Sequence, residues 1–144
     1  MRVGVEIGVL GPARAGVARY VWNMVREMMR AAPEVEFVFY AGWPTEIPLP
    51  PGNWRLREPA GRFRRVFELW VQEDLPRLLA ADGIDVFWGQ GFVMPSRRFG
   101  RCLRVLTVHD LTSKLFPQSM ELHTRLSYGA LLPTAARAAD RVVV

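Results

Sequence analysis

Short apolar runs alternate with helical segments along this chain, and this alternation restricts its fold more than any other feature. Four such runs cover residues 3–10, 35–41, 84–89 and 103–108. Apolar runs of this length are typical of strands that are buried on both faces, as in parallel sheets. Strands separated by helices imply βαβ units with right-handed crossovers. The sequence therefore predicts an α/β fold, with a Rossmann-like parallel sheet and helices on both of its faces.

Helices are expected where apolar residues recur at spacings of three and four. The expected helices cover residues 17–32, 62–73, 74–81 and 118–139. Pro76 is tolerated in the first turn of a helix, whereas Pro133 predicts a kink inside the last one. The stripe expected on that helix consists of Leu122, Leu126 and Ala130. Two shorter runs, 54–58 and 141–144, are expected to add the third and sixth strands.

The length of 144 residues suits one domain with a core. No apolar run approaches the ~18 residues of a membrane helix, and we expect no signal peptide and a cytoplasmic location. Cys102 is the only cysteine, so an intrachain disulfide is excluded and the residue is interpreted as an inert apolar side chain. A strand at 141–144 would ordinarily be followed by a covering helix. We therefore expect a truncated domain that can self-associate through this strand.

The formal net charge is +5, and Lys114 is the only lysine among the basic residues. The arginines are concentrated at residues 55–65 and 97–104. A basic face attracts phosphates or anionic lipid, but a solvated arginine-rich surface gives the same pattern, and no nucleic-acid partner is expected. Peripheral docking at the inner face of the membrane is an alternative use of one basic and aromatic segment. That segment consists of Arg62, Phe63, Arg64, Arg65, Phe67 and Trp70.

Three loops should meet at the carboxyl edge of the sheet, where the first strands of its two halves lie side by side. These loops cover residues 11–16, 90–95 and 109–115. The first contains Gly11 and Gly16 and opens a helix at Val17, whose free N–H groups suit a phosphate or a sugar hydroxyl. Simple turn chemistry is the alternative interpretation. The G-x-G-x-x-G fingerprint and the P-loop lysine are both missing.

His109 and Asp110 are the main catalytic candidates, because they directly follow a buried strand. The imidazole can donate or accept a hydrogen bond near neutral pH. The alternative is a boundary histidine with Asp110 capping the following turn. Gln90 and Gly91 offer an amide and a close backbone approach, or are ordinary loop residues. Lys114 either faces an anion in the cleft or is solvated.

Other kinds of site are poorly supported. His123 lies in a polar helical context and is expected at the surface. Two histidines and scattered acids do not make a metal site. His109 has no nucleophile within sequence reach, so a hydrolase is disfavoured.

Several segments together resemble the retaining GT-B glycosyltransferases of family 4 (glycosyltransferase group 1). The segment GVARYVWNMVREM is similar to the family's G-[IV]-G-R-Y helix opening, and FELWVQEDLPRLL to its W-E-Q-x-x-L-P stretch. DVFWGQGFVMP and ARAADRVVV also resemble family segments. The most specific is VLTVHDLTSKLFP, which matches T-[IV]-H-D-L. The resemblance covers essentially the whole chain and implies the N-terminal, acceptor-side half of such an enzyme.

The resemblance implies a reaction and roles for individual residues. A sugar would pass from a nucleotide-sugar donor to a glycan or lipid-linked acceptor with retention, without a metal or other cofactor. Gly16 and its neighbours would approach the donor, and His109 would hydrogen-bond the transferring sugar or the acceptor hydroxyl. Asp110 would hold that turn, and Arg19 would be structural or face the acceptor.

This chain departs from the family pattern at several positions. Ala18 replaces the second glycine of the helix opening and leaves less room for a close ligand. Glu6 is unusual within the first strand, and Gln90-Gly91 stands where the family often has Pro-Asn or Pro-His.

The resemblance also places the donor-binding domain outside residues 1–144, so the chain alone is expected to be inactive. The alternative is a non-catalytic α/β module that binds an anionic ligand or a protein partner.

Overall fold

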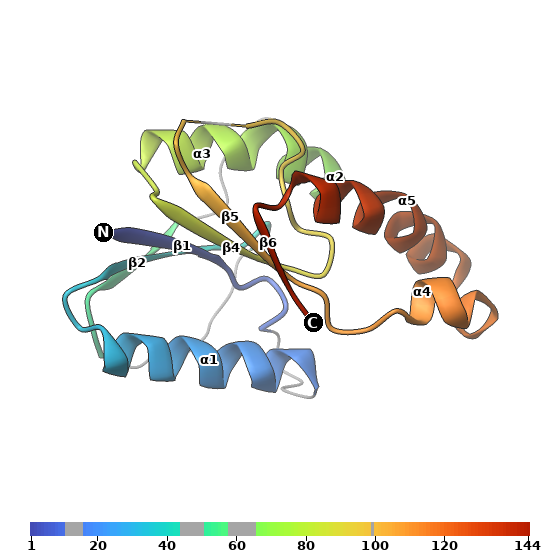
Figure 1. Cartoon of the computed structure of the whole chain (residues 1–144), viewed down its shortest axis with the longest axis horizontal. Coiled ribbons are helices and arrows are strands. Elements are labelled where there is room, and N and C mark those ends of the chain that lie inside the picture. Colours follow the sequence, from blue (N-terminus) through green and yellow to red (C-terminus); the bar gives the residue numbers. More distant parts are fainter. Residues whose placement is uncertain (11–15, 44–50, 58–65, 99) are drawn as a thin grey trace.

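A computed structural model describes residues 1–10, 16–43, 51–57, 66–98 and 100–144. Within these ranges the chain forms a six-stranded sheet in the order β3-β2-β1-β4-β5-β6, and every neighbouring pair is parallel (Figure 1). The strands are β1 (Arg2–Glu6), β2 (Glu36–Tyr40), β3 (Trp54–Arg57), β4 (Val86–Gln90), β5 (Leu103–Thr107) and β6 (Arg141–Val143). This confirms the predicted Rossmann-like sheet. It also places β1 beside β4, where a crevice is expected.

Helices cover both faces of the sheet, as predicted (Figure 1). Helix α1 (Val17–Ala31) packs on one face through Val21 and Val25, which are fully buried against strand residues such as Phe39. The opposite face is covered by α2 (Phe67–Leu69), η1 (Trp70–Asp74), α3 (Leu75–Ala81) and α5 (Leu122–Ala138). Between β5 and α5 lie two short helices, α4 (Thr112–Leu115) and η2 (Pro117–Ser119). The two cores together fix the strand ends that carry the site.

The first strand is shorter than predicted. We expected a strand over 3–10, but β1 ends at Glu6 and the chain then turns, with the Leu10 N–H donating to the Ile7 carbonyl at 2.9 Å. The Glu6 carboxyl group accepts from the Gly8 N–H at 2.6 Å, which ties the last residue of β1 to the turn that follows it.

The expected boundary between helices 62–73 and 74–81 was wrong. The chain is helical from α2 through η1 to α3, and η1 is a wide π turn in which the Leu75 N–H reaches the Trp70 carbonyl. The ring of Pro76 would clash with the carbonyl four residues earlier in a regular α-helix. A wide turn just before the proline relieves this crowding. Residues 62–65 lie outside the described residues.

The apolar stripe expected on the last helix was also wrong. Leu122 and Leu126 are exposed by 68% and 62%, whereas Leu132 and Ala135 are buried, and Ala135 belongs to the core under the sheet. The helix projects beyond the sheet at its amino end, so its first turns have no strand to pack on (Figure 1). It continues through Pro133 as one helix.

Two arginines of the basic stretch 55–65 are held by a buried carboxylate. Asp82, at the end of α3, accepts from the Tyr40 hydroxyl at 2.7 Å and pairs with Arg55 and Arg57, each at 3.1 Å. Burial raises the pKa of Tyr40, and the neighbouring Asp82 raises it further. The cluster ties β2 and β3 to α3. These two arginines therefore serve the fold.

Two aromatic residues of the predicted membrane-docking segment, Phe67 and Trp70, lie in the described part of the chain. Trp70 is buried in the core and Phe67 packs against that core, so neither aromatic residue forms an exposed face. Arg62 and its neighbours through Arg65 lie outside the described residues. Among the helices of the described ranges, none combines the length and the apolar character that crossing a membrane requires.

Candidate functional site

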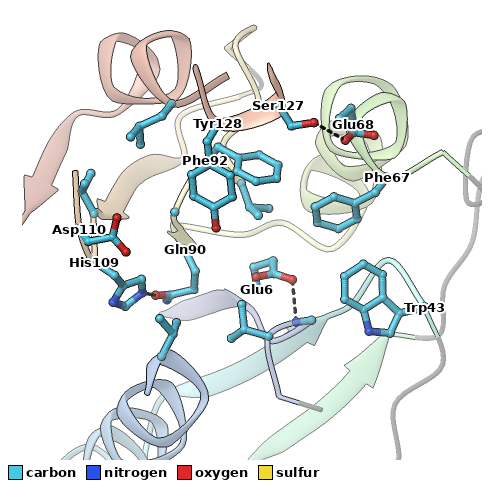
Figure 2. Close-up of a pocket in the computed structure, with 17 residues that line it drawn as sticks. Glu6, Trp43, Phe67, Glu68, Gln90, Phe92, His109, Asp110, Ser127 and Tyr128 are labelled. Atoms are coloured by element: carbon cyan, nitrogen blue, oxygen red, sulfur yellow. Dashed lines mark hydrogen bonds between the residues drawn. The ribbon is translucent and has the colours of Figure 1, made fainter. Parts of the chain in front are cut away.

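A cavity of about 450 Å³ lies at the carboxyl ends of β1, β4 and β5 (Figure 2). The segments after these strands form one side of it, and α2 and α5 close the other. Its lining residues are Glu6, Gly8, Val9, Val17, Trp43, Phe67, Glu68, Gln90, Gly91, Phe92, Val93, Val108, His109, Asp110, Ser127, Tyr128 and Leu132. These residues come from segments that are far apart in the sequence, between Glu6 and Leu132. The parallel topology of the sheet brings these segments together to form the cavity.

His109 and Gln90 form a hydrogen-bonded pair at the cavity. The Nε2 atom of His109 lies 3.0 Å from Oε1 of Gln90. An amide oxygen can only accept, so His109 Nε2 donates and Nδ1 is left as the acceptor of the neutral ring. Burial lowers the pKa of His109, although the charge of Asp110 opposes this. The lowered pKa favours the neutral imidazole, whose Nδ1 carries a lone pair.

The orientation of this histidine is fixed from two further sides. Tyr20 of α1 contacts the imidazole edge to face, with 5.2 Å between the ring centroids. Asp110 accepts from the Thr112 N–H at 2.7 Å, and this bond holds the turn after β5. The turn-capping interpretation of Asp110 is thereby confirmed, and the same residue lines the cavity.

Glu6 lies at the floor of the cavity between Gln90 and Trp43 (Figure 2). Its side chain is fully buried, and its Oε1 atom accepts the Gly8 N–H. Burial raises the pKa of Glu6 to about 8, while the Gly8 hydrogen bond lowers it in part. The carboxyl group is consequently mostly protonated at pH 7. A neutral acid of this kind can donate as well as accept a hydrogen bond.

Aromatic side chains form the opposite wall, which we call the aromatic wall: Trp43, Phe67, Phe92 and Tyr128 (Figure 2). Their rings contact one another in sequence, with centroid separations of 4.9, 6.1 and 4.7 Å. Burial raises the pKa of Tyr128, and the charges of Asp110 and Glu6 add to this. Glu68 lies beside this wall and accepts from the Ser127 hydroxyl at 3.3 Å. The cavity thus has a polar floor and an apolar side.

The predicted site residues fall into three groups. Those that the cavity brings together are Val17, Gln90, Gly91, His109 and Asp110. Those that lie outside its lining are Gly16, Arg19 and Lys114, all of them exposed. Gly11 lies outside the described residues.

The conformation of Gly16 explains the glycine there. Its φ is +52°, and a Cβ atom would meet nothing within 4 Å, so backbone freedom and not close packing requires it. Ala18, which we expected to crowd a ligand, is buried in the α1 core and is not part of the lining. The alanine therefore does not narrow the cavity.

Sequence reasoning singled out Gln90 and noted that Glu6 is unusual, but it assigned Glu6 no place in the site and missed the aromatic wall. A lone carboxylate inside an apolar strand was a visible signal for Glu6. Trp43, Phe67, Phe92 and Tyr128 carried no comparable signal, because their convergence depends on how α2 and α5 pack over the sheet.

The charges of the cavity limit what it can hold. Its ionisable lining residues in the described ranges are Glu6, Glu68, His109, Asp110 and Tyr128, with no arginine or lysine. In the same ranges no three His, Cys, Asp or Glu side chains are grouped as metal ligands would be. The cavity therefore suits hydroxyl groups and apolar surface better than an anion.

Comparison with known proteins adds an independent finding. The model of the family described as Glycosyltransferase Family 4 matches residues 14–144. No curated protein matches the sequence. The matched range contains Gln90, His109 and the aromatic wall, whereas Glu6 precedes it.

Proposed function

The chain belongs to glycosyltransferase family 4, and from this premise we propose that it forms the N-terminal, acceptor-side part of a retaining GT-B enzyme. The reaction would move a sugar from a nucleotide-sugar to a hydroxyl of a glycan or lipid-linked acceptor. The configuration at the anomeric carbon would be retained.

The observation that carries this proposal is the His109–Gln90 pair at the polar edge of the cavity. A neutral imidazole whose Nδ1 has no hydrogen-bond partner among the described residues can accept a hydrogen bond from a sugar hydroxyl. Gln90 fixes the ring by accepting from Nε2 at 3.0 Å, and Tyr20 restricts its rotation. Oriented hydrogen-bonding groups of this kind position a hydroxyl for reaction without becoming part of the bond change. In this proposal Asp110 is a positioning residue, because it holds the turn that carries His109.

A panel of phenyl glycosides of glucose, galactose and mannose tests the proposal. We expect at least one to bind saturably in a calorimetric or NMR titration of the purified chain. His109→Ala should weaken that binding about tenfold, which corresponds to one lost hydrogen bond of about 1.4 kcal/mol. Lys114→Ala is the matched control, since Lys114 is exposed outside the lining, and should bind like the unmodified chain. Equal binding by the His109→Ala variant contradicts the assigned role.

The same geometry argues against the alternative of a module that binds an anion. The described lining has three carboxylic acids and no arginine or lysine, and Arg55 and Arg57 are already paired with Asp82. Replacing both arginines with glutamate should therefore lower stability without changing glycoside affinity in the protein that still folds.

A further inference from the structure

Two buried polar atoms without a partner belong to residues that line the same cavity. Within the described residues, the buried side-chain N and O atoms that lack a hydrogen bond are Glu6 Oε2, Trp70 Nε1, Gln90 Nε2 and Arg104 Nε. Glu6 and Gln90 are cavity residues, whereas Trp70 and Arg104 are not part of its lining. Buried polar groups are nearly always paired, so an unpaired one asks for an explanation. Two such atoms on residues of one cavity leave donors and acceptors there that a polar ligand could pair.

The surroundings of Glu6 give its carboxyl group a definite character. Among the described residues, only the Gly8 N–H forms a hydrogen bond with it, through Oε1. The ionisable groups that line the cavity around it are Tyr128 of α5, Glu68 of α2, and His109 and Asp110 after β5. In register on β2 lies Tyr40, whose hydroxyl donates to Asp82 instead. No described neighbour supplies a positive charge that would favour a carboxylate, so the neutral acid is the stable form.

We propose that Glu6 and Gln90 form a hydrogen-bonding floor for the hydroxyl groups of an uncharged sugar, and that the aromatic wall packs against an apolar substituent of that sugar. Glu6 Oε2–H and Gln90 Nε2–H each donate to a ligand oxygen. Both donor atoms are buried in the structure, so donation to a ligand requires each side chain to rotate about its last torsion, which has a broad energy well. The inference rests on the proposed function and names the substrate class of the same site.

The floor also makes the cavity selective. A ligand carboxylate would lie close to Glu6, Glu68 and Asp110 without a compensating cation in the described lining. No ion pair would then compensate the free energy that the carboxylate loses on leaving water. A hydroxyl group loses much less free energy when it enters the cavity. Uncharged sugars should therefore bind better than their uronic acid counterparts.

Phenyl β-D-glucopyranoside and phenyl β-D-glucuronide form a matched pair of probes that differ at one carbon. We would titrate both into the unmodified chain, Glu6→Gln and Glu73→Gln at pH 7.0 and 9.5. Glu73 pairs with Arg77 and is not part of the lining, so its exchange is the matched control. In the unmodified chain a carbon NMR titration of the Glu6 carboxyl, with and without the glucoside, gives a readout that needs no variant.

We expect the glucoside to bind at least tenfold more tightly than the glucuronide at pH 7.0. Its affinity should fall about tenfold at pH 9.5 in the unmodified chain and in Glu73→Gln, because ionised Glu6 no longer donates. Glu6→Gln should bind at both pH values alike, since an amide donates without titrating. The glucoside should also move the titration midpoint of Glu6 upward.

Equal affinity for the two probes would overturn the inference, and so would an unchanged pH dependence in Glu6→Gln or a midpoint that does not move. If the glucoside still binds and His109→Ala weakens it, the proposed function stands while the inference fails. If no glycoside of either experiment binds, the proposed function fails and the inference falls with it.

Discussion

Glu6 makes the stability of the protein depend on pH in a calculable direction. Its pKa is about 8 in the folded chain and near 4.5 when burial is lost. Between these values the folded chain keeps a proton that the unfolded chain releases. The free energy of unfolding therefore falls by up to about 1.4 kcal/mol for each pH unit in this window, and the loss is complete above pH 8.

Glu6→Gln should remove this dependence. Urea unfolding at pH 5 is expected to give similar stabilities for the variant and the unmodified chain, because both side chains are neutral in the folded state. At pH 8.5 the variant should be the more stable of the two. Glu73→Gln should follow the unmodified chain at both pH values, and identical pH profiles for all three proteins would show that Glu6 ionises normally.

Individual residues of the site differed in how far the sequence revealed them. His109 stood out because a histidine directly after a buried strand has a position defined by the topology. Glu6 was visible as an anomaly, but its neutral form depends on its complete burial in the folded chain, which no local pattern encodes. Tyr128 lies in a helix whose apolar stripe was assigned to the wrong side, so its place in the cavity could not be foreseen.

The turn between β4 and the cavity depends on a glycine at one position. A Cβ atom on Gly89 would lie 2.0 Å from the carbonyl oxygen of Val93. This clash is with backbone, which cannot move aside as the end of a flexible side chain can. That turn is closed by the Val93 N–H, which donates to the Gln90 carbonyl at 2.9 Å. It carries Gly91 and Phe92 to the cavity. Gly89→Ala should therefore cost about 2 kcal/mol or more and weaken glycoside binding as well.

In contrast to Gly89→Ala, the substitution Gly129→Ala in α5 is expected to raise the stability of the protein. A Cβ atom there would meet nothing within 4 Å, so the alanine should raise stability by about 0.5–1 kcal/mol through helix propensity alone. Chemical denaturation of the two variants measures the contrast. A Gly89→Ala variant as stable as Gly129→Ala would contradict the close packing of the β4 turn.

At the level of elements, the strands were easier to predict than the helices. All six strands were located within a few residues, because short apolar runs and, for β3, an alternating pattern are distinctive. The helices 62–73 and 74–81 were separated before Asp74 because Pro76 suggested a first turn, since sequence patterns do not reveal a π turn that accommodates the proline. The stripe Leu122–Leu126–Ala130 was periodic but has no surface to cover, so periodicity alone did not identify the buried side.

For the whole molecule, alternation of strands and helices was sufficient to predict the parallel sheet and the crevice beside β1. The order β3-β2-β1-β4-β5-β6 follows from right-handed crossovers that first extend the sheet on one side of β1 and then on the other. The edge position of β6 also agrees with that order, and its residues are exposed. Self-association through this strand stays a prediction.

The charge distribution of the whole site leads to the last prediction, which concerns turnover. Departure of a nucleoside diphosphate develops negative charge that a transferase must stabilise with cations or aligned donors. No arginine or lysine lines the cavity in the described residues, and its acids would oppose that charge. The 144-residue chain should therefore bind a glycoside but release no nucleoside diphosphate from UDP-glucose or GDP-mannose above the buffer rate, in a coupled assay with each phenyl glycoside as acceptor. Sustained release that His109→Ala abolishes would show that the chain alone supplies the missing stabilisation.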